Sequence, residues 1–358
     1  MWCEKNDDLG TRIKETLLCG ISYDEGVFKD RPHEKGLLAC QAIFAFYNGQ
    51  KSPTDNQSLF SGLLGGYSAY ERCTCTRLVS QTAPRQNHAG PGLGDEDIVL
   101  AISFRRNKLF VLDSSSGRVF FYSTASFIKV PAVPLISDTL DQFDSALIWL
   151  EEYAGRLEGG YFKAGEIVPY IGITEGILLF PSLCTSRLQN SAAAGHRRVQ
   201  AVSRAVTRGV EVIASSVFTP EFLEMGLAHI YSIRIRLLTQ DESDYASVSD
   251  RGFETCQLRD RHWHIRDDRQ GKTDRIDGPG VIGYYPLFRE GGYRADMDDR
   301  VGVEEIGVFA YQSCSGPGHG SFWGSLSFVP GSRKRPTGDI FEVEVAPFAL
   351  DMNPPFLY

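Results

Sequence analysis

The last third of the chain alternates apolar and charged residues with a period of two. Between Phe341 and Val345, three apolar residues alternate with Glu342 and Glu344. Successive side chains of an extended strand point to opposite faces, so one face of this segment is expected to be buried and the other wet. Similar segments, separated by glycine and proline, precede it. The pattern predicts a β-sandwich. A sandwich of this kind more often binds a partner than performs chemistry.

Length and charge narrow the class of protein. The 358 residues are enough for two domains, each able to bury its own core. The content of 42% hydrophobic and 23% charged residues is typical of a soluble globular protein. Phosphate binding normally requires a basic excess, whereas the net charge here is -8. We therefore expect no nucleic-acid partner.

The sequence also bears on compartment. No apolar run is long enough to cross a bilayer, and the acidic opening at 1–8 is unlike a signal or transit peptide. The eight cysteines are mostly scattered, which favours reduced thiols over a disulfide framework. We expect a protein of the cytoplasm, the nucleus or both, with no membrane partner.

The first half has a mixed pattern. Apolar residues recur at helical spacing within 9–18, and an apolar run at 37–47 ends at a turn signal. The interval 98–122 predicts three strands of a small antiparallel meander, and 144–157 predicts a helix closed by two glycines. An α+β domain over residues 1–165 is the resulting prediction.

A basic interval separates the two halves. Between Glu175 and Glu211 the chain has five arginines and no acidic residue, and its middle, 189–195, is small and polar. Contact with an acidic partner or RNA is one interpretation, but a solvated connector is favoured. We predict a flexible basic linker at 166–206 and an all-β domain at 207–358.

Six ordered motifs in the second half resemble those of the ApaG domain. They lie at 256–258, 261–265, 278–283, 309–314, 324–331 and 341–348. The resemblance covers about residues 207 to 358 and implies a fibronectin- or immunoglobulin-like sandwich. The segment 289–303 is longer and more charged than the corresponding loop of the family.

Four motifs of the first half resemble the SUKH-like domain of the cell-wall-regulator type. They lie at 46–50, 62–70, 99–121 and 149–152. This domain precedes ApaG in certain plant F-box proteins, which are substrate receptors of Skp-cullin-F-box (SCF) ubiquitin ligases. The resemblance implies a non-enzymatic protein-interaction module whose partner is a protein substrate. The alternative is a phosphate- or nucleotide-binding sensor or hydrolase that uses the ApaG glycine turn.

The sequence gives no sign of the F-box that would bind the Skp adaptor. In these relatives an F-box lies N-terminal to the SUKH-like part, and nothing before Asn48 resembles one. Two interpretations stay open, a truncated or alternative gene product and a member that has lost its adaptor contact. Direct contact with the Skp adaptor is therefore not expected from this chain.

The glycine motif has two interpretations. Gly278, Gly280 and Gly283 match G-x-G-x-x-G, whose amides cradle a pyrophosphate when the motif joins a strand to a helix. The following 284–287 is strand-like and contains proline, so a tight β-turn is favoured. An anion-binding nest at the three glycines is the alternative.

The sequence contains few motifs that would indicate metal binding or catalysis. His262 and His264 share one face of a strand and need a third ligand to hold zinc; solvent exposure is favoured. The conceivable third ligands are Cys256, Cys314 and His319. A dyad of Ser313 or Ser315 with His319 is less favoured than a glycine-rich turn. No nucleophile elbow or Walker loop is present. We expect no catalytic residue, metal or cofactor.

Overall fold

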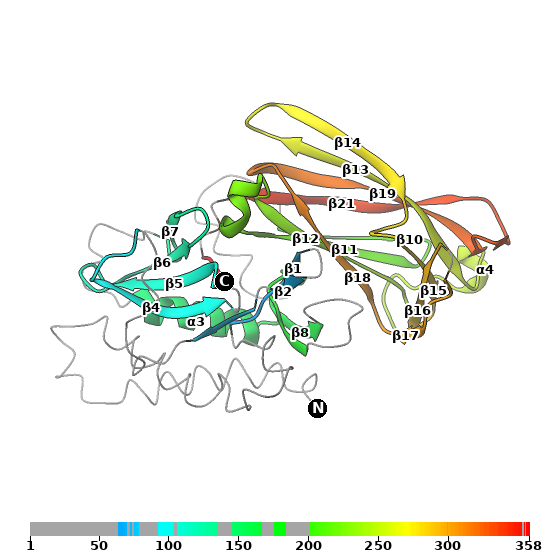
Figure 1. The fold of residues 1–358 in the computed structure, drawn as a ribbon. Helices are drawn as coiled ribbons and strands as arrows, with labels where there is room; N and C mark the ends of the chain where they lie inside the picture. The colour runs from blue at the N-terminus through cyan, green and yellow to red at the C-terminus, as the bar shows by residue number, and fades with distance from the viewer. Residues whose placement is uncertain are drawn as a thin grey trace. The chain divides into compact units, whose positions relative to one another are not determined.

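The structure is a computed structural model of the 358-residue chain (Figure 1). It describes residues 64–69, 72–73, 75–78, 92–103, 106–134, 145–166, 175–183, 201–298, 300–352, 354 and 356–358. The helical patterns predicted at 9–18 and 37–47 lie outside these residues. Two compact units are present, one of 192–217 with 229–352, and one of 1–191 with 218–228 and 353–358.

The unit of 192–217 and 229–352 contains two antiparallel sheets. One has four strands in the order β10-β11-β12-β18, and the other has eight, with β14 and β21 joined to β13 and β19 (Figure 1). The four strands are β10 (Val202–Thr207), β11 (Val210–Phe218), β12 (His229–Leu237) and β18 (Phe309–Ser315). The eight are β13 (Cys256–Asp267), β14 (Lys272–Pro279), β15 (Tyr284–Arg289), β16 (Gly292–Met297), β17 (Glu304–Ile306), β19 (His319–Ser332), β20 (Arg335–Pro336) and β21 (Phe341–Asp351).

Aromatic side chains from both sheets form the core of this unit. The ring of Tyr231 on β12 lies 4.7 Å from that of Phe322 on β19, and Phe309 on β18 lies 6.0 Å from Phe288 on β15. Rings at this separation contribute about 0.5–1.5 kcal/mol beyond their buried area. The two sheets therefore pack face to face.

The alternation predicted for the last strand is confirmed. Val343 and Val345 are fully or almost fully buried, whereas Glu342 and Glu344 are exposed. Each fully buried valine contributes about 1.5–3 kcal/mol through removal of apolar surface from water. The strand thus buries one face because its sequence has an apolar residue at every second position.

The other unit combines helix and sheet within its described residues. A five-stranded antiparallel sheet has the order β3-β4-β5-β6-β7, and α3 (Ser145–Glu158) packs on β6 (Figure 1). The predicted meander and helix are confirmed to within a residue or two. The strands of this unit are β1 (Ser68–Ala69), β2 (Arg72–Cys73), β3 (Thr76–Leu78), β4 (Asp97–Ser103), β5 (Lys108–Asp113), β6 (Arg118–Ser123), β7 (Lys129–Pro131), β8 (Lys163–Glu166) and β9 (Glu175–Leu178).

Trp149 connects α3 to the end of the chain. Its ring is tilted against Phe110 of β5 with centroids 4.5 Å apart, and its Nε1–H donates to the carbonyl of Leu357 at 2.9 Å. The segment 218–228, which includes the 3₁₀ helix η6 (Pro220–Met225), belongs to the same unit. This unit is therefore discontinuous in sequence. Besides residues 1–191 it includes two segments from the second half of the chain, 218–228 and 353–358.

The predicted division at residues 165 and 206 stays a prediction. Strand β9 falls inside the interval 166–206 that was expected to be a linker, and β10 begins inside it. The segment 289–303, expected to be a charged loop, includes strand β16. Among the described residues, no helix is both long and apolar enough to span a membrane.

Candidate functional site

The glycine motif forms a tight turn between two strands. Val281 and Tyr284 exchange backbone hydrogen bonds, with Val281 N–H donating to the Tyr284 carbonyl at 2.9 Å and Tyr284 N–H donating back at 2.8 Å. Between them Ile282 and Gly283 have φ values of 42° and 85°. Two central residues with positive φ define a type I′ hairpin turn. The prediction of a tight β-turn, in place of a strand-to-helix dinucleotide loop, is confirmed.

Several amides around this turn donate within the protein. The Gly280 N–H donates to the carbonyl of Arg259 at 2.8 Å, and the amides of Val281 and Tyr284 close the hairpin. An anion nest requires neighbouring amides that point together at the ligand. The conformation of Gly280 is required for the fold itself, because a Cβ there would lie 2.5 Å from the Tyr284 carbonyl. Anion binding by Gly278, Gly280 and Gly283 stays a prediction.

A positive charge is held beside the motif. The guanidinium of Arg261, whose residue pairs with Gly278 in the sheet, donates to the carbonyls of Pro279 at 2.9 Å and Gly280 at 2.7 Å. A Cβ at Gly278 would lie 3.0 Å from the same guanidinium. Arg261 thus fixes the glycine segment through its carbonyl oxygens, a role that the sequence did not reveal because it depends on strand register.

His262 lies in a line of hydrogen bonds across four strands. Its Nδ1 is 2.8 Å from Oδ1 of Asp277 on β14, and its Nε2 is 3.0 Å from Oγ of Ser327 on β19. The Ser327 hydroxyl donates to Glu342 on β21. The pKa of Asp277 is lowered, chiefly by its hydrogen bond with His262. Sequence reasoning missed this line, since its members meet only through cross-strand pairing.

The order Asp277, His262, Ser327 resembles a hydrolase triad, but its protons are placed differently. In such a triad the serine hydroxyl donates to the histidine, which acts as general base. Here the hydroxyl of Ser327 donates to Glu342, and Ser327 is only 4% exposed. This arrangement ties the edges of neighbouring strands together and does not activate a nucleophile.

The second histidine faces an aromatic ring. His264 stacks on Trp323 with centroids 5.4 Å apart and 11° between the planes. Of the conceivable third zinc ligands, Cys256 is buried, which raises the pKa of its thiol, and His319 Nδ1 lies 3.6 Å from Asp351. Within the described part of the chain, no group of three His, Cys, Asp or Glu side chains has metal-binding geometry.

One end of the larger sheet exposes apolar side chains on its end strand and on the segment that leads into it. Val301, Val303 and Ile306 are 72%, 74% and 92% exposed, and among the described strands β17 pairs with β16 alone. We name residues 300–308 the β17 edge. It was missed from the sequence because 289–303 has the charge density of a solvated loop.

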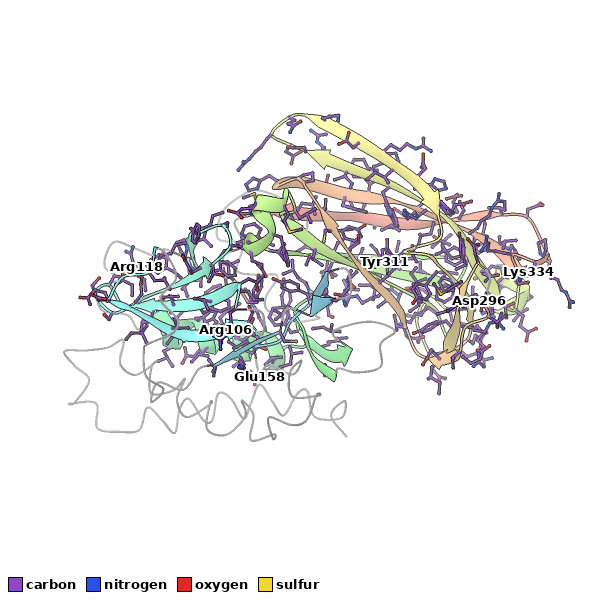
Figure 2. All side chains as sticks on the ribbon, in the orientation of Figure 1. Arg106, Arg118, Glu158, Asp296, Tyr311 and Lys334 are labelled. Carbon is purple, nitrogen blue, oxygen red and sulfur yellow. The ribbon has the colours of Figure 1, made fainter. Side chains whose placement is uncertain are left out.

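Asp296 of β16, which is labelled in Figure 2, holds the β17 edge through a hydrogen bond with Gly302. One carboxylate oxygen accepts from the Gly302 amide at 2.9 Å, while Arg294 donates to both oxygens at 2.7 and 2.9 Å. Gln257 of β13 donates to the same carboxylate at 3.1 Å. These bonds lower the pKa of Asp296 although burial alone would raise it. Its ionised form therefore orients the chain that carries Val301 and Val303.

The other unit contains a buried ionic cluster. Lys108 Nζ lies 3.8 Å from Glu221 and 4.5 and 4.7 Å from the ring centres of Tyr67 and Tyr358. The Tyr67 hydroxyl donates to Glu221, and burial followed by the charge of Glu221 raises the pKa of Tyr67. Buried charges require such partners, because desolvation of an unpaired ion is costly. The cluster anchors segment 218–228 and the chain end within this unit.

Comparison with known proteins gives the class to which the two-sheet unit belongs. Residues 224–294 match the family model described as ApaG domain. Protein ApaG of Anaeromyxobacter dehalogenans (strain 2CP-C) is 30% identical over 42% of this chain and 94% of its own length. The putative ApaA protein from Bordetella pertussis, a solved structure, is 22% identical over 43% of this chain and 98% of that one, with a TM-score of 0.27. The family match shows that the chain contains an ApaG domain, and its described residues are mostly β-sheet.

A longer match extends beyond that domain. F-box protein SKIP16 of Arabidopsis thaliana is 32% identical over 95% of this chain and 74% of its own length. The chain belongs to the family of ApaG-containing F-box-type proteins that includes SKIP16.

Proposed function

We propose that the chain is a non-enzymatic protein-interaction module related to the substrate-recognition subunits of SCF ubiquitin ligases. The observation that carries the proposal is the similarity to an F-box protein along 95% of the chain, including the half outside the ApaG domain. We infer that this other half is a SUKH-like domain. The proposed site of action is the cytoplasm, the nucleus or both.

The chemistry of the ApaG unit supports binding in preference to catalysis. In the arrangement that most resembles a catalytic triad, Asp277, His262 and Ser327, the Ser327 hydroxyl donates its hydrogen bond to Glu342 and not to His262. The β17 edge, in contrast, presents Val303 and Ile306 to solvent on an ordered scaffold. Exposed apolar residues grouped in this way are typical of interaction sites.

A phosphate-binding sensor or hydrolase at the glycine turn has weaker support. The one observation in its favour is the guanidinium of Arg261 against Gly278. That guanidinium already donates to the Pro279 and Gly280 carbonyls, and the Gly280 amide donates to Arg259. A protein ligand is therefore the stronger candidate.

Affinity capture tests the proposed function. The tagged full chain is expressed in plant cells, and captured proteins are quantified with and without proteasome inhibition. SKIP16 is the positive control. A second version of this chain has the SKIP16 F-box fused to its N-terminus, and it shows what binding to the Skp adaptor adds. The expected result is a set of partners shared by both versions, with ubiquitylation of these partners increased by the graft. Absence of any shared partner would contradict the proposal.

A further inference from the structure

The end strand of the larger sheet has backbone groups directed away from its neighbour. Gly307 N–H donates to the Gly291 carbonyl at 2.9 Å, in the same register that pairs Ile306 with Gly292 and Glu304 with Arg294. Hydrogen-bonded and non-hydrogen-bonded pairs alternate along an antiparallel ladder. The amides and carbonyls of Glu304 and Ile306 therefore point to the free side of β17, ready to pair with another strand.

The apolar residues beside this free side are concentrated. Met297, Val301, Val303, Ile306 and Val308 are all between 40% and 92% exposed and lie within twelve consecutive positions, 297 to 308. Natural sheets usually protect a free edge by charge, proline or cover, since an apolar edge invites pairing. β17 has two such protections, since it is only three residues long and carries the exposed Glu304 and Glu305, yet Ile306 and the valines beside it remain exposed among the described residues.

The charge of the edge indicates what kind of partner fits. Residues 298–308 contain four acidic residues and one basic residue. Two of these carboxylates are paired with arginines, Glu304 with Arg289 at 2.9 Å and Asp298 with Arg333 at 3.1 Å. The exposed Glu305 of β17 is therefore the carboxylate that supplies the acidic character of the strand. Complementary charge across an interface favours correct partners and repels wrong ones. An acidic, apolar edge is complementary to a strand that combines basic and apolar residues.

The edge is also organised before any partner arrives. Asp296 accepts from the Gly302 amide at 2.9 Å, and Met297 and Arg300 exchange backbone hydrogen bonds at 2.9 and 3.3 Å. A surface that is already ordered avoids part of the entropic cost of binding.

We infer that the β17 edge is a docking site for an extended, basic and apolar segment of a partner protein, which adds to the sheet as one further strand. Main-chain hydrogen bonds to Glu304 and Ile306 supply affinity, while contacts with Val303, Glu305 and Ile306 supply selectivity. The inference rests on the proposed function, because it names the form in which a protein partner is recognised.

Selection from a library of random twelve-residue linear peptides tests the inference on the full chain. Ile306→Lys changes the exposed edge, and Ile276→Lys on β14 is the matched control, being the same substitution at another strand residue with an exposed side chain. We expect enriched peptides that alternate apolar and basic residues. Their affinity should fall about tenfold or more with Ile306→Lys and remain within about twofold with Ile276→Lys. Equal thermal unfolding midpoints would show that both variants fold.

N-methylation of the enriched peptide tests strand pairing directly. Methyl groups on alternate amides block one hydrogen-bonding edge of an extended peptide, so one of the two alternate registers should abolish binding and the other should preserve it. Peptides that bind Ile306→Lys as well as the wild type overturn the inference, as does a library that yields no binder. Concentration-dependent dimerisation abolished by Ile306→Lys also overturns it, because a second copy then occupies the edge. Partners recovered in the capture experiment with Ile306→Lys would leave the proposed function intact while this inference fails.

Discussion

Lys108 and Glu221 lie 3.8 Å apart with both side chains fully buried, although 113 positions separate them in the sequence. The pair brings η6, which follows β11 of the ApaG unit, into the other unit. The rings of Tyr67 and Tyr358 also lie against Lys108. Removal of Lys108 would leave the Glu221 carboxylate buried, with the Tyr67 hydroxyl as hydrogen-bond donor but without this cation.

We predict that Lys108→Met lowers the free energy of unfolding by about 3–5 kcal/mol, the usual cost of breaking a buried ion pair. The double variant Lys108→Met with Glu221→Gln should recover part of this loss, since neither member of the pair is then charged. Urea unfolding of the three proteins checks the prediction. If the double variant loses as much unfolding free energy as the two single variants lose together, the two side chains do not interact.

Acid is expected to destabilise the ApaG unit through His229. This buried histidine, whose Nδ1 lies 2.9 Å from the Pro317 carbonyl, has a pKa lowered by burial from 6.5 to about 4. Because the unfolded chain binds the proton more tightly, its contribution is fully present above pH 6.5 and is lost as the pH falls towards about 4. The loss amounts to at most about 3 kcal/mol.

Urea unfolding between pH 4 and 7.5 measures this effect. His229→Asn keeps a donor near the position of Nδ1 and removes the titrating ring, so its stability should vary less over the same pH interval. An identical pH profile for the variant and the wild type would assign the acid sensitivity to other groups.

The two glycines of the turn should respond differently to alanine. At Gly283, φ is 85° and the space around a Cβ is open, so we expect a loss of about 1–2 kcal/mol from backbone strain alone. At Gly280, φ is 54° and a Cβ would lie 2.5 Å from the Tyr284 carbonyl and 2.9 Å from the Tyr285 ring. Gly280→Ala should therefore cost more than Gly283→Ala. Thermal unfolding compares them, and equal losses would contradict the predicted clash.

The same geometry determines how anion binding at Gly278, Gly280 and Gly283 is to be tested. Bulky substitutions at Gly280 disturb the fold, so loss of a ligand there would not identify a nest. Calorimetric titration with inorganic pyrophosphate on the wild type and on Arg261→Gln is the appropriate measurement. Saturable heat that disappears in a folded Arg261→Gln protein would support an anion site, and its absence from the wild type would exclude pyrophosphate as the ligand.

We predict that Ser327 does not react with a fluorophosphonate probe. A nucleophilic serine gives its proton to the neighbouring histidine, whereas Ser327 donates to Glu342 and is almost fully buried. Mass spectrometry of the treated protein reports labelling, with trypsin as the positive control. Modification of Ser327 that disappears in His262→Ala would identify a working triad and contradict the non-enzymatic proposal.

The fold of the ApaG unit could be read from the sequence wherever the signal was local. The alternation at Val343 and Val345 predicted a half-buried strand, and positive φ at Gly283 agrees with the predicted turn. The motif at 278–283 also falls within the residues that match the ApaG family model. Such features need only neighbouring residues, because side-chain direction and turn geometry repeat over short distances.

Features that depend on register were not predictable. His262 meets Asp277 across one strand boundary and Ser327 across another, and a shift of one residue in either pairing would separate them. Likewise, the exposure of Ile306 became visible only when β17 was found at the end of the sheet.

The β-rich second half, the meander and helix of the first half, and the family of the protein could all be predicted from periodicity and motifs, because both depend on consecutive residues. The folded structure was needed to show that Glu221 lies beside Lys108, that His262 contacts Asp277 and Ser327, and that β17 is at the end of its sheet among the described strands. These relationships join residues distant in sequence, and their position is set by strand pairing and core packing, which no local pattern encodes.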